Sequence, residues 1–90
     1  MILISQMKFG LGRVVITPDA LEAIPADDIC RALDRHVCGD WGDVDGAANE
    51  LALQSGLRLL SVYHTADGAK FFVLTTADRN LTTILLPVDY

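Results

Sequence analysis

Residues 57–75 read LRLLSVYHTADGAKFFVLT and set the architecture of the chain. Two runs of aliphatic, β-branched and aromatic residues, 57–64 and 70–75, flank a short polar segment and predict two strands. Asp67-Gly68 in that segment predicts a β-hairpin, because both residues tolerate the positive φ angles of a type I′ turn. The sequence therefore predicts an antiparallel strand pair.

The segment after this hairpin predicts a third strand beside it. Ala77–Asn80 is a polar reversal, which an Asx turn or an Asp78–Arg79 ion pair is expected to close. Residues 81–86 are almost all apolar or β-branched, and Pro87 ends the run. Such a continuous pattern is typical of a strand that is buried on both faces or central in its sheet.

One more strand is expected near the N-terminus. Val14-Val15-Ile16 is β-branched, and the strand is expected to extend back toward Phe9 and Ile2–Ile4. Thr17-Pro18-Asp19 then provides an N-cap, a proline at the first helical position and an early acidic residue. A helix is therefore expected directly after this strand.

Three helical segments, at 21–24, 26–37 and 45–55, separate this strand from the hairpin. Pro25 ends the first helix. Gly39 and Gly56 suit the left-handed position that follows a helix C-terminus. The apolar residues at helical spacing are Ala26, Ile29, Cys30, Leu33 and Val37 in the second helix, and Ala48, Leu51 and Ala52 in the third. The order β-α-α-α-β-β-β predicts an α+β fold, an antiparallel sheet with helices packed on one face.

Length and composition predict a single domain over residues 1–90. A hydrophobic content of 51% supports a folded core. No apolar run approaches the roughly 20 residues of a membrane span, and the N-terminal run is too short for a signal peptide. Cys30 and Cys38 in one helical segment would lie about 12 Å apart, too far for a disulfide. A cytoplasmic protein is expected, with both thiols reduced and packed as small hydrophobic side chains.

The acidic residues are concentrated in one third of the chain. Residues 19–50 contain nine acidic and two basic side chains, net −7, whereas the rest of the chain is net +2. Asp19 and Asp45 are placed to favour helix N-termini, and Arg31 is placed to pair with Asp27 and Asp34 along one helix. Two interpretations remain open, a solvated helical surface or a surface complementary to a basic partner.

The candidate partner-binding residues come from this segment. Trp41 lies between two glycines and two aspartates, and it is either a lid over the core or an exposed anchor for a partner. The acidic candidates that lack an evident cation nearby in sequence, together with Asp45 and Trp41, give this set: Glu22, Asp40, Trp41, Asp43, Asp45 and Glu50.

Catalytic and metal-binding roles have little support in the residues. His36, Cys38 and Asp40 lie close in sequence, but there is no paired Cys-x-x-Cys and no second close histidine. Core thiols and a helix-terminal His36, favourable to the helix dipole when protonated, are the simpler interpretation. Arg79 as an anion-binding residue is an alternative to a closing turn. We therefore expect no enzyme activity, no cofactor and no metal.

Several stretches together resemble a small family carried by phages, plasmids and other bacterial mobile elements. The most specific are Gly39-Asp40-Trp41-Gly42-Asp43, Thr75-x-Ala77-Asp78-Arg79 and the tail Leu85-Leu86-Pro87-x-Asp89-Tyr90. The resemblance covers nearly the whole chain beyond Gln6. Members of the family usually begin near the position of Met7, which implies that residues 1–6 are an N-terminal extension. The chain departs from the family pattern at Phe72, where tryptophan is common, and at Thr76, where glutamate is common.

This resemblance, with the small size and acidic character, implies an inhibitor of host defence similar to anti-CRISPR proteins. Such a protein would bind the basic nucleic-acid groove of a host complex, for example a type I CRISPR effector in the bacterial cytoplasm, and block DNA binding. It would contact a protein subunit rather than nucleic acid or membrane, as a monomer or weak homodimer. The alternative is a structural or regulatory module that self-associates through an exposed sheet face or edge.

Overall fold

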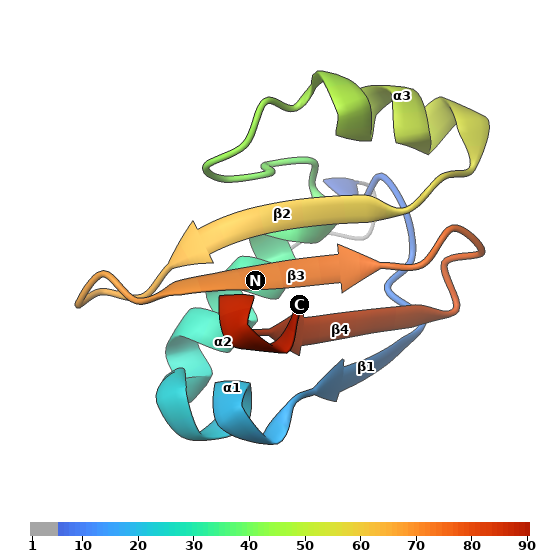
Figure 1. Ribbon diagram of the computed structural model, residues 1–90. Coiled ribbons are helices and arrows are strands. Elements are labelled where there is room, and N and C mark those ends of the chain that lie inside the picture. Colours follow the sequence, from blue (N-terminus) through green and yellow to red (C-terminus); the bar gives the residue numbers. More distant parts are fainter. Residues whose placement is uncertain (1–5) are drawn as a thin grey trace.

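A four-stranded sheet lies at the centre of the fold in the computed structural model, which describes residues 6–90 (Figure 1). Its strands are β1 (Arg13–Ile16), β2 (Leu59–His64), β3 (Lys70–Thr75) and β4 (Leu81–Leu85), in the order β1-β4-β3-β2. β4 is therefore an interior strand, as its apolar run predicts. The element order and the α+β class are confirmed.

The sheet is mostly antiparallel, and one strand pair differs from the prediction. β2 with β3 and β3 with β4 are antiparallel, whereas β1 lies parallel to β4, with Val14 opposite Thr82 and Ile16 opposite Ile84. A parallel pair needs a long connection between its strands. The three helices and the β2–β3 hairpin supply that connection here.

The helices are α1 (Pro18–Ala23), α2 (Ala26–Val37) and α3 (Ala47–Ser55), and a short 3₁₀ helix, η2 (Pro87–Asp89), ends the chain. The predicted N-cap is confirmed, because the Ala20 N–H donates to Thr17 Oγ1 at 3.3 Å. Helix α1 begins at Pro18, the predicted first helical position. Gly39 and Gly56 have φ angles of 81° and 70°, as expected after α2 and α3.

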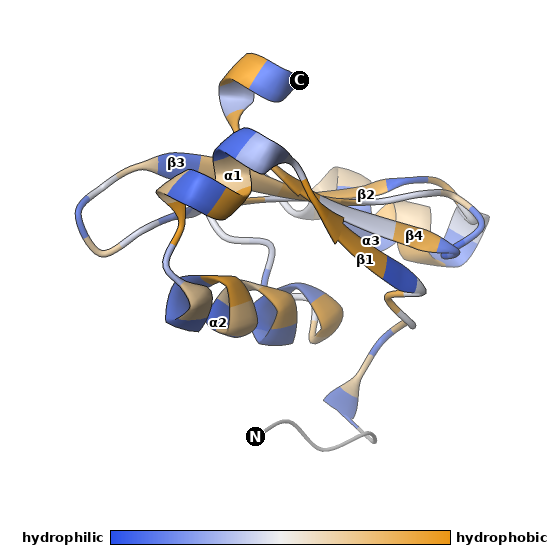
Figure 2. Cartoon of the chain, turned by 90° about the horizontal axis from the view of Figure 1, so that it is seen from below, coloured by the Kyte–Doolittle hydropathy of each residue, from blue (hydrophilic) through white to orange (hydrophobic). Residues whose placement is uncertain are grey.

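The core lies on the sheet face that α2 covers (Figure 2). One apolar cluster joins α1 and α2 to β2, β3 and β4 through Ala20, Ile29, Tyr63, Phe71 and Ile84, among others. A second cluster joins α3 and the preceding loop to β2, and it contains Trp41, Ala52 and Leu59. Every strand residue in both clusters points to this face, since the registers place these residues directly across from one another or two apart. On the opposite face lies η2 (Figure 2).

The helix faces that pack on this core differ from the predicted stripes. In α2, Ala26 and Cys30 are exposed, and Ala32 and His36 are buried instead. The interpretation of Cys30 as a core thiol is therefore wrong, although both cysteines are free. The buried stripe includes the polar His36, which a search for apolar spacing passes over.

In α3, Ala48 and Leu51 are exposed, whereas Asn49 and Ala52 are buried. Asn49 takes the place of an apolar residue because its side-chain amide both donates to and accepts from the Leu60 backbone, at 2.7 and 3.0 Å. Two hydrogen bonds to one residue of β2 fix α3 against the sheet edge and satisfy the buried amide.

The hairpin loop and the start of β1 correct two further expectations. In the hairpin only Gly68 has a positive φ, of 93°, and the Thr65 N–H donates to the Ala69 carbonyl. The connection is a three-residue loop ending in a left-handed glycine, not a type I′ turn. β1 begins at Arg13 and does not reach Phe9, and the expected extension to Ile2–Ile4 falls outside the described residues.

Candidate functional site

The loop between α2 and α3 is held against the edge strand β2 by backbone hydrogen bonds. The Val62 N–H donates to the Trp41 carbonyl at 3.1 Å, and the Asp43 N–H donates to the Val62 carbonyl at 2.8 Å. Gly42 forms a parallel bridge with Val62, and its φ is 74°. A Cβ at residue 42 would collide with the Val62 carbonyl oxygen and the Tyr63 ring. This close approach therefore requires glycine.

Trp41 is a lid over the second core cluster, with 6% of its surface exposed. Its ring is stacked on Phe9, with the centroids 6.1 Å apart, and meets His36 edge-on at 5.7 Å. Its Nε1–H donates to Glu50 Oε2 at 2.8 Å. The lid interpretation is therefore confirmed, and Trp41 contributes to a surface mainly by fixing the loop that carries the neighbouring aspartates.

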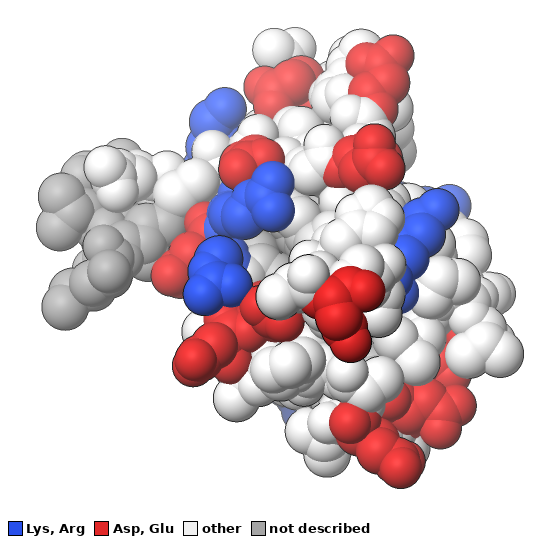
Figure 3. Space-filling model, turned by 90° about the vertical axis from the view of Figure 1, so that its left-hand side faces the viewer, with Lys and Arg blue, Asp and Glu red and all other residues white. Residues whose placement is uncertain are grey.

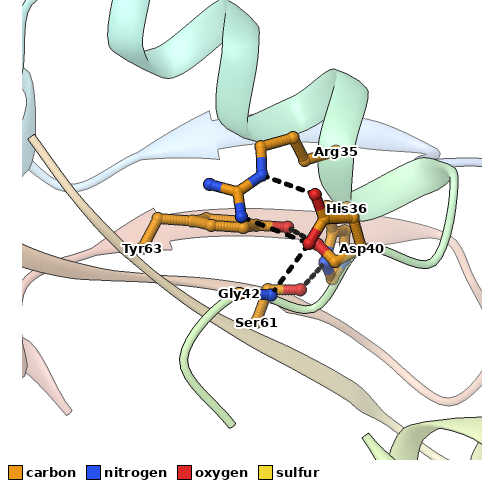
Figure 4. A network of polar contacts seen from close by, with 6 residues as sticks. All are labelled: Arg35, His36, Asp40, Gly42, Ser61 and Tyr63. Atoms are coloured by element: carbon orange, nitrogen blue, oxygen red, sulfur yellow. Dashed lines mark hydrogen bonds and ion pairs between the residues drawn. The ribbon is translucent and has the colours of Figure 1, made fainter.

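Asp40 is paired with Arg35 at the end of α2 (Figure 4). The Arg35 guanidinium donates to both Asp40 carboxylate oxygens, at 2.8 and 3.2 Å, and lies 4.6 Å from the centre of the Tyr63 ring. Asp40 also accepts from the Gly42 N–H, and its carbonyl accepts from the Tyr63 hydroxyl at 2.6 Å. The hydrogen bond from Arg35 is the main reason that the pKa of Asp40 is lowered. Asp40 thus has a cation only five residues away, which the sequence reasoning missed.

Two more candidate acids have structural partners. Glu50 lies 3.8 Å from Lys8 Nζ, in addition to accepting from Trp41. Asp45 Oδ1 accepts from the Ala47 N–H at 3.1 Å, at the start of α3, which confirms its expected place at a helix N-terminus. These contacts fix the shape of the loop.

The structure brings five of the six candidates together and places the sixth elsewhere. Asp40, Trp41, Asp43, Asp45 and Glu50 lie in the loop and in α3, beside β2, whereas Glu22 lies in α1 toward the β1 side of the sheet (Figure 1).

Asp43 and Glu22 differ from the other four candidates in their contacts. Both are exposed, and within residues 6–90 neither carboxylate forms an ion pair or accepts a hydrogen bond, whereas Asp45 accepts one from Ala47 and Trp41 donates one to Glu50. Their carboxylates are consequently free to meet a partner without breaking an internal contact. A partner-binding role for the six residues stays a prediction.

His36 is a buried polar residue, and the sequence reasoning did not predict its burial. His36 is fully buried, with Nδ1 2.6 Å from Ser61 Oγ and Nε2 2.9 Å from Thr75 Oγ1. Thr75 Oγ1 lies 2.7 Å from Thr82 Oγ1, and the Thr82 hydroxyl donates to the Leu11 carbonyl at 2.7 Å. His36 lies in the last turn of α2, as expected. Burial lowers its pKa to about 4, so at neutral pH it does not carry the charge that would favour the helix dipole.

The Leu11 carbonyl ends this series of hydrogen bonds and fixes the position of every proton in the series. Because the Thr82 proton goes to a carbonyl, Thr82 Oγ1 accepts from Thr75, and Thr75 in turn accepts from His36. His36 is therefore the neutral Nε2–H tautomer, and its Nδ1 accepts from the Ser61 hydroxyl. The helical spacing of His36 from Ile29 gave the only sequence signal for this burial.

Within residues 6–90, His36 forms no hydrogen bond to a cysteine. Both of its ring nitrogens are occupied by hydroxyl groups. Cys38, two residues away, is half-buried, and Cys30 is exposed. Within residues 6–90, no three histidine, cysteine or acidic side chains gather in a way that could hold a metal ion.

Arg79 closes the C-terminal end of α3. Its φ is 63°, and its guanidinium donates to the carbonyls of Ala52 and Leu57 at 3.0 and 2.5 Å. The predicted Asp78–Arg79 pair is absent among the ion pairs of the described chain. Asp78 instead accepts from the Asn80 N–H at 3.0 Å, which confirms the alternative Asx turn. The hydrogen bond from Arg79 to the Leu57 carbonyl joins residues 22 positions apart, so no local sequence pattern indicated it.

A shallow hollow between α2 and the β2–β3 hairpin carries the only arginines of the acidic segment. It encloses ≈ 220 Å³, part of it open solvent, with Arg31, Arg35 and His64 in its lining. Arg31 pairs with Asp28 at 2.9 Å rather than with the predicted Asp27 or Asp34. On this side of the molecule, acidic side chains spread from one end to the other with basic ones between them (Figure 3).

Comparison with protein-family models, with curated proteins and with solved structures finds no match to this chain. In residues 6–90, no helix combines the length and the apolar character that crossing a bilayer requires.

Proposed function

We propose that this protein is a small non-catalytic inhibitor that binds a basic, nucleic-acid-binding groove of a host defence complex, as anti-CRISPR proteins do. The observation that carries the proposal is the exposure of the acidic segment. Of the nine acidic residues between 19 and 50, eight are exposed, and only Asp28 is half-buried. A partner with a basic groove would be attracted to such a surface and oriented by it.

The exposed acids divide into those that shape the loop and those that are free to bind. Asp40 and Glu50 bind Arg35 and Trp41, so their exchange would disturb the fold as well as a binding surface. The exposed acids of the segment whose carboxylates accept no hydrogen bond and form no ion pair within residues 6–90 are Asp19, Glu22, Asp27, Asp34 and Asp43. We propose that these five make the main electrostatic contacts.

Charge density limits how the protein can replace DNA. The longest dimension of the molecule is 33 Å, a length over which duplex DNA carries about 20 charges at one per ~1.7 Å. Eight exposed acids cannot match that density. The protein would therefore occupy part of a groove and exclude DNA by its bulk, with the carboxylates supplying attraction and orientation.

A gel-shift assay tests the proposal with purified type I CRISPR effectors and their target DNA. We expect added protein to abolish the DNA complex and to co-migrate with the effector. The variant Glu22→Gln/Asp43→Asn should weaken inhibition about fivefold to tenfold, because two attractive contacts are lost without an internal bond.

The matched control is Ala69→Lys/Asn80→Lys, which raises the net charge by the same two units at exposed positions outside the acidic segment. Equal weakening by both variants would show that only net charge matters and would overturn the assigned surface. Undisturbed DNA binding by every effector, with the protein folded, would overturn the proposed function.

A further inference from the structure

The outer edge of β1 carries backbone groups that no strand of the described chain pairs with. β1 is the terminal strand of the sheet. The N–H groups of Arg13 and Thr17 donate to Asn80 and Ile84, so they point toward β4. Because backbone direction alternates along a strand, the N–H and C=O groups of Val14 and Ile16 point away from the sheet.

The two edges of the sheet are protected differently. At the β2 edge, the bridge between Gly42 and Val62 covers part of the strand. Arg13–Ile16 is short and begins with a charged residue, but it contains no proline, lysine or bulge, three of the devices that prevent edge pairing. Val14, in the middle of this edge, is apolar and 39% exposed. β1 is thus a strand edge open to pairing.

We propose that β1 pairs antiparallel with β1 of a second copy of this chain, about a twofold axis through Val15. In this register Val14 of each copy faces Ile16 of the other, and their outward groups form four hydrogen bonds. If the twofold axis passed through Val14 instead, Gly12 would have to take part in the strand pairing. The φ of Gly12 is 64°, which is not an extended conformation. The backbone therefore favours the register through Val15 over the one through Val14.

Charge complementarity supports a second copy as the occupant of this edge. The same register places Arg13 of one copy opposite Thr17 of the other. Thr17 Oγ1 donates to Asp89 Oδ2 at 2.7 Å, so a carboxylate lies next to the arriving guanidinium. Arg13 is exposed, and none of the three ion pairs within residues 6–90 includes it. The pairing thus forms two symmetric Arg13–Asp89 contacts.

These groups also lie on the same side of the sheet. Ile16 packs with the core that α2 covers, so Arg13, Val15 and Thr17 alternate to the opposite side. That side is where η2, which contains Asp89, lies (Figure 2).

The dimer would continue the cross-strand row Val15–Thr83–Leu74–Leu60 over eight strands. So short an edge gives a weak, concentration-dependent dimer, and the pairing is independent of the proposed inhibitor function.

Sedimentation equilibrium over a wide concentration range tests the pairing, with charge-reversed chains measured alone and mixed. Arg13→Glu alone sets two carboxylates against each other at both symmetric contacts, and Asp89→Arg alone sets two guanidinium groups against each other there. We expect either change to raise the dimer Kd about tenfold or more. An equimolar mixture of the two variants should regain heterodimer, since one chain then brings both carboxylates and the other brings both guanidinium groups.

Two further variants separate the edge from other surfaces. Val14→Pro removes an outward N–H that the monomer does not use, and it should abolish dimerisation while the circular dichroism spectrum is retained. Arg58→Glu, an exposed arginine just before β2 at the other edge, is the matched control and should leave Kd unchanged. A wild-type monomer at millimolar concentration, or a dimer indifferent to Arg13→Glu and Val14→Pro, would overturn the proposal.

Discussion

His36 Nδ1 lies 2.6 Å from Ser61 Oγ, and both side chains are wholly buried between α2 and β2. The other ring nitrogen is bound to Thr75 on β3, and the ring edges meet Phe9 and Trp41. One neutral histidine therefore ties a helix, two strands and the aromatic lid together. Its protonation state is part of the fold.

The stability of the protein should fall as His36 becomes protonated in the unfolded chain. Burial, with a smaller contribution from Arg79, lowers the pKa of His36 from 6.5 to about 4. Between these values the unfolded chain binds a proton at His36 and the folded chain does not. The stabilisation is present above pH 6.5 and is lost as pH falls toward 4. We expect the free energy of unfolding to drop by about 2 kcal/mol between pH 7 and pH 5, measured by urea denaturation.

Substitution at the two histidines identifies the source of that pH dependence. His36→Gln should be less stable at pH 7 but should lose the dependence between about pH 5 and 7. His64→Gln changes an exposed histidine and should retain it. The prediction fails if His36→Gln keeps the wild-type slope. Asp40, whose pKa is lowered by Arg35, contributes only at more acidic pH.

The hydroxyl chain predicts a single tautomer for His36. Nitrogen NMR shifts should show Nε2 protonated and Nδ1 unprotonated at neutral pH. Ser61→Ala leaves Nδ1 buried without a donor and should cost about 1–3 kcal/mol of stability. Ser55→Ala, at an exposed position at the end of α3, is the control and should cost far less. An Nδ1–H tautomer would contradict the proton order derived from the Leu11 carbonyl.

Local signals explain why the element boundaries were predictable. Thr17, Pro25, Gly39 and Gly56 each act within a few residues of their own backbone, through a cap, a missing N–H or a positive φ. The structure places all four at helix ends. The five acidic candidates were chosen from composition, since charge is visible in the sequence, and their role in binding stays a prediction.

Contacts between distant segments explain what the sequence could not show. The parallel position of β1 depends on where the chain returns after more than sixty residues. Whether Glu50 is free depends on Trp41 and Lys8, which only the fold brings near it. The acidic segment could be predicted as a group, but its division into structural and free carboxylates could not.

The guanidinium group of Arg79 should be needed for full stability, and lysine should not replace it. Its two amino groups reach the carbonyls of Ala52, in the last turn of α3, and of Leu57, just beyond it, while the guanidinium lies 5.8 Å from the Phe9 ring centre. Lysine has no planar fork to bind both carbonyls. We expect Arg79→Lys to cost about 1–2 kcal/mol in denaturation experiments and to speed amide exchange at the end of α3. Arg58→Lys, at an exposed position, is the control; equal effects at both sites would contradict the clamp.

Gly42 and Gly68 separate the cost of a positive φ from the cost of a collision. Both have positive φ angles, of 74° and 93°, so alanine is strained at either position. At Gly68 an added Cβ meets nothing within 4 Å, whereas at Gly42 it meets the Val62 carbonyl oxygen and the Tyr63 ring. Gly68→Ala should therefore cost about 1 kcal/mol. Gly42→Ala should cost several kcal/mol more, because it also forces the loop away from β2 and breaks its two backbone bonds.

Thermal denaturation of both alanine variants measures the difference, and tryptophan fluorescence reports its cause. If the bridge between residue 42 and Val62 holds Trp41 in place, Gly42→Ala should red-shift the Trp41 emission as the ring leaves its contacts with Phe9 and His36. Gly68→Ala should leave the emission unchanged, because its loop lies at the far end of the β2–β3 hairpin. Equal stability losses with an unshifted spectrum would mean that the loop is held by its aspartates rather than by its approach to β2.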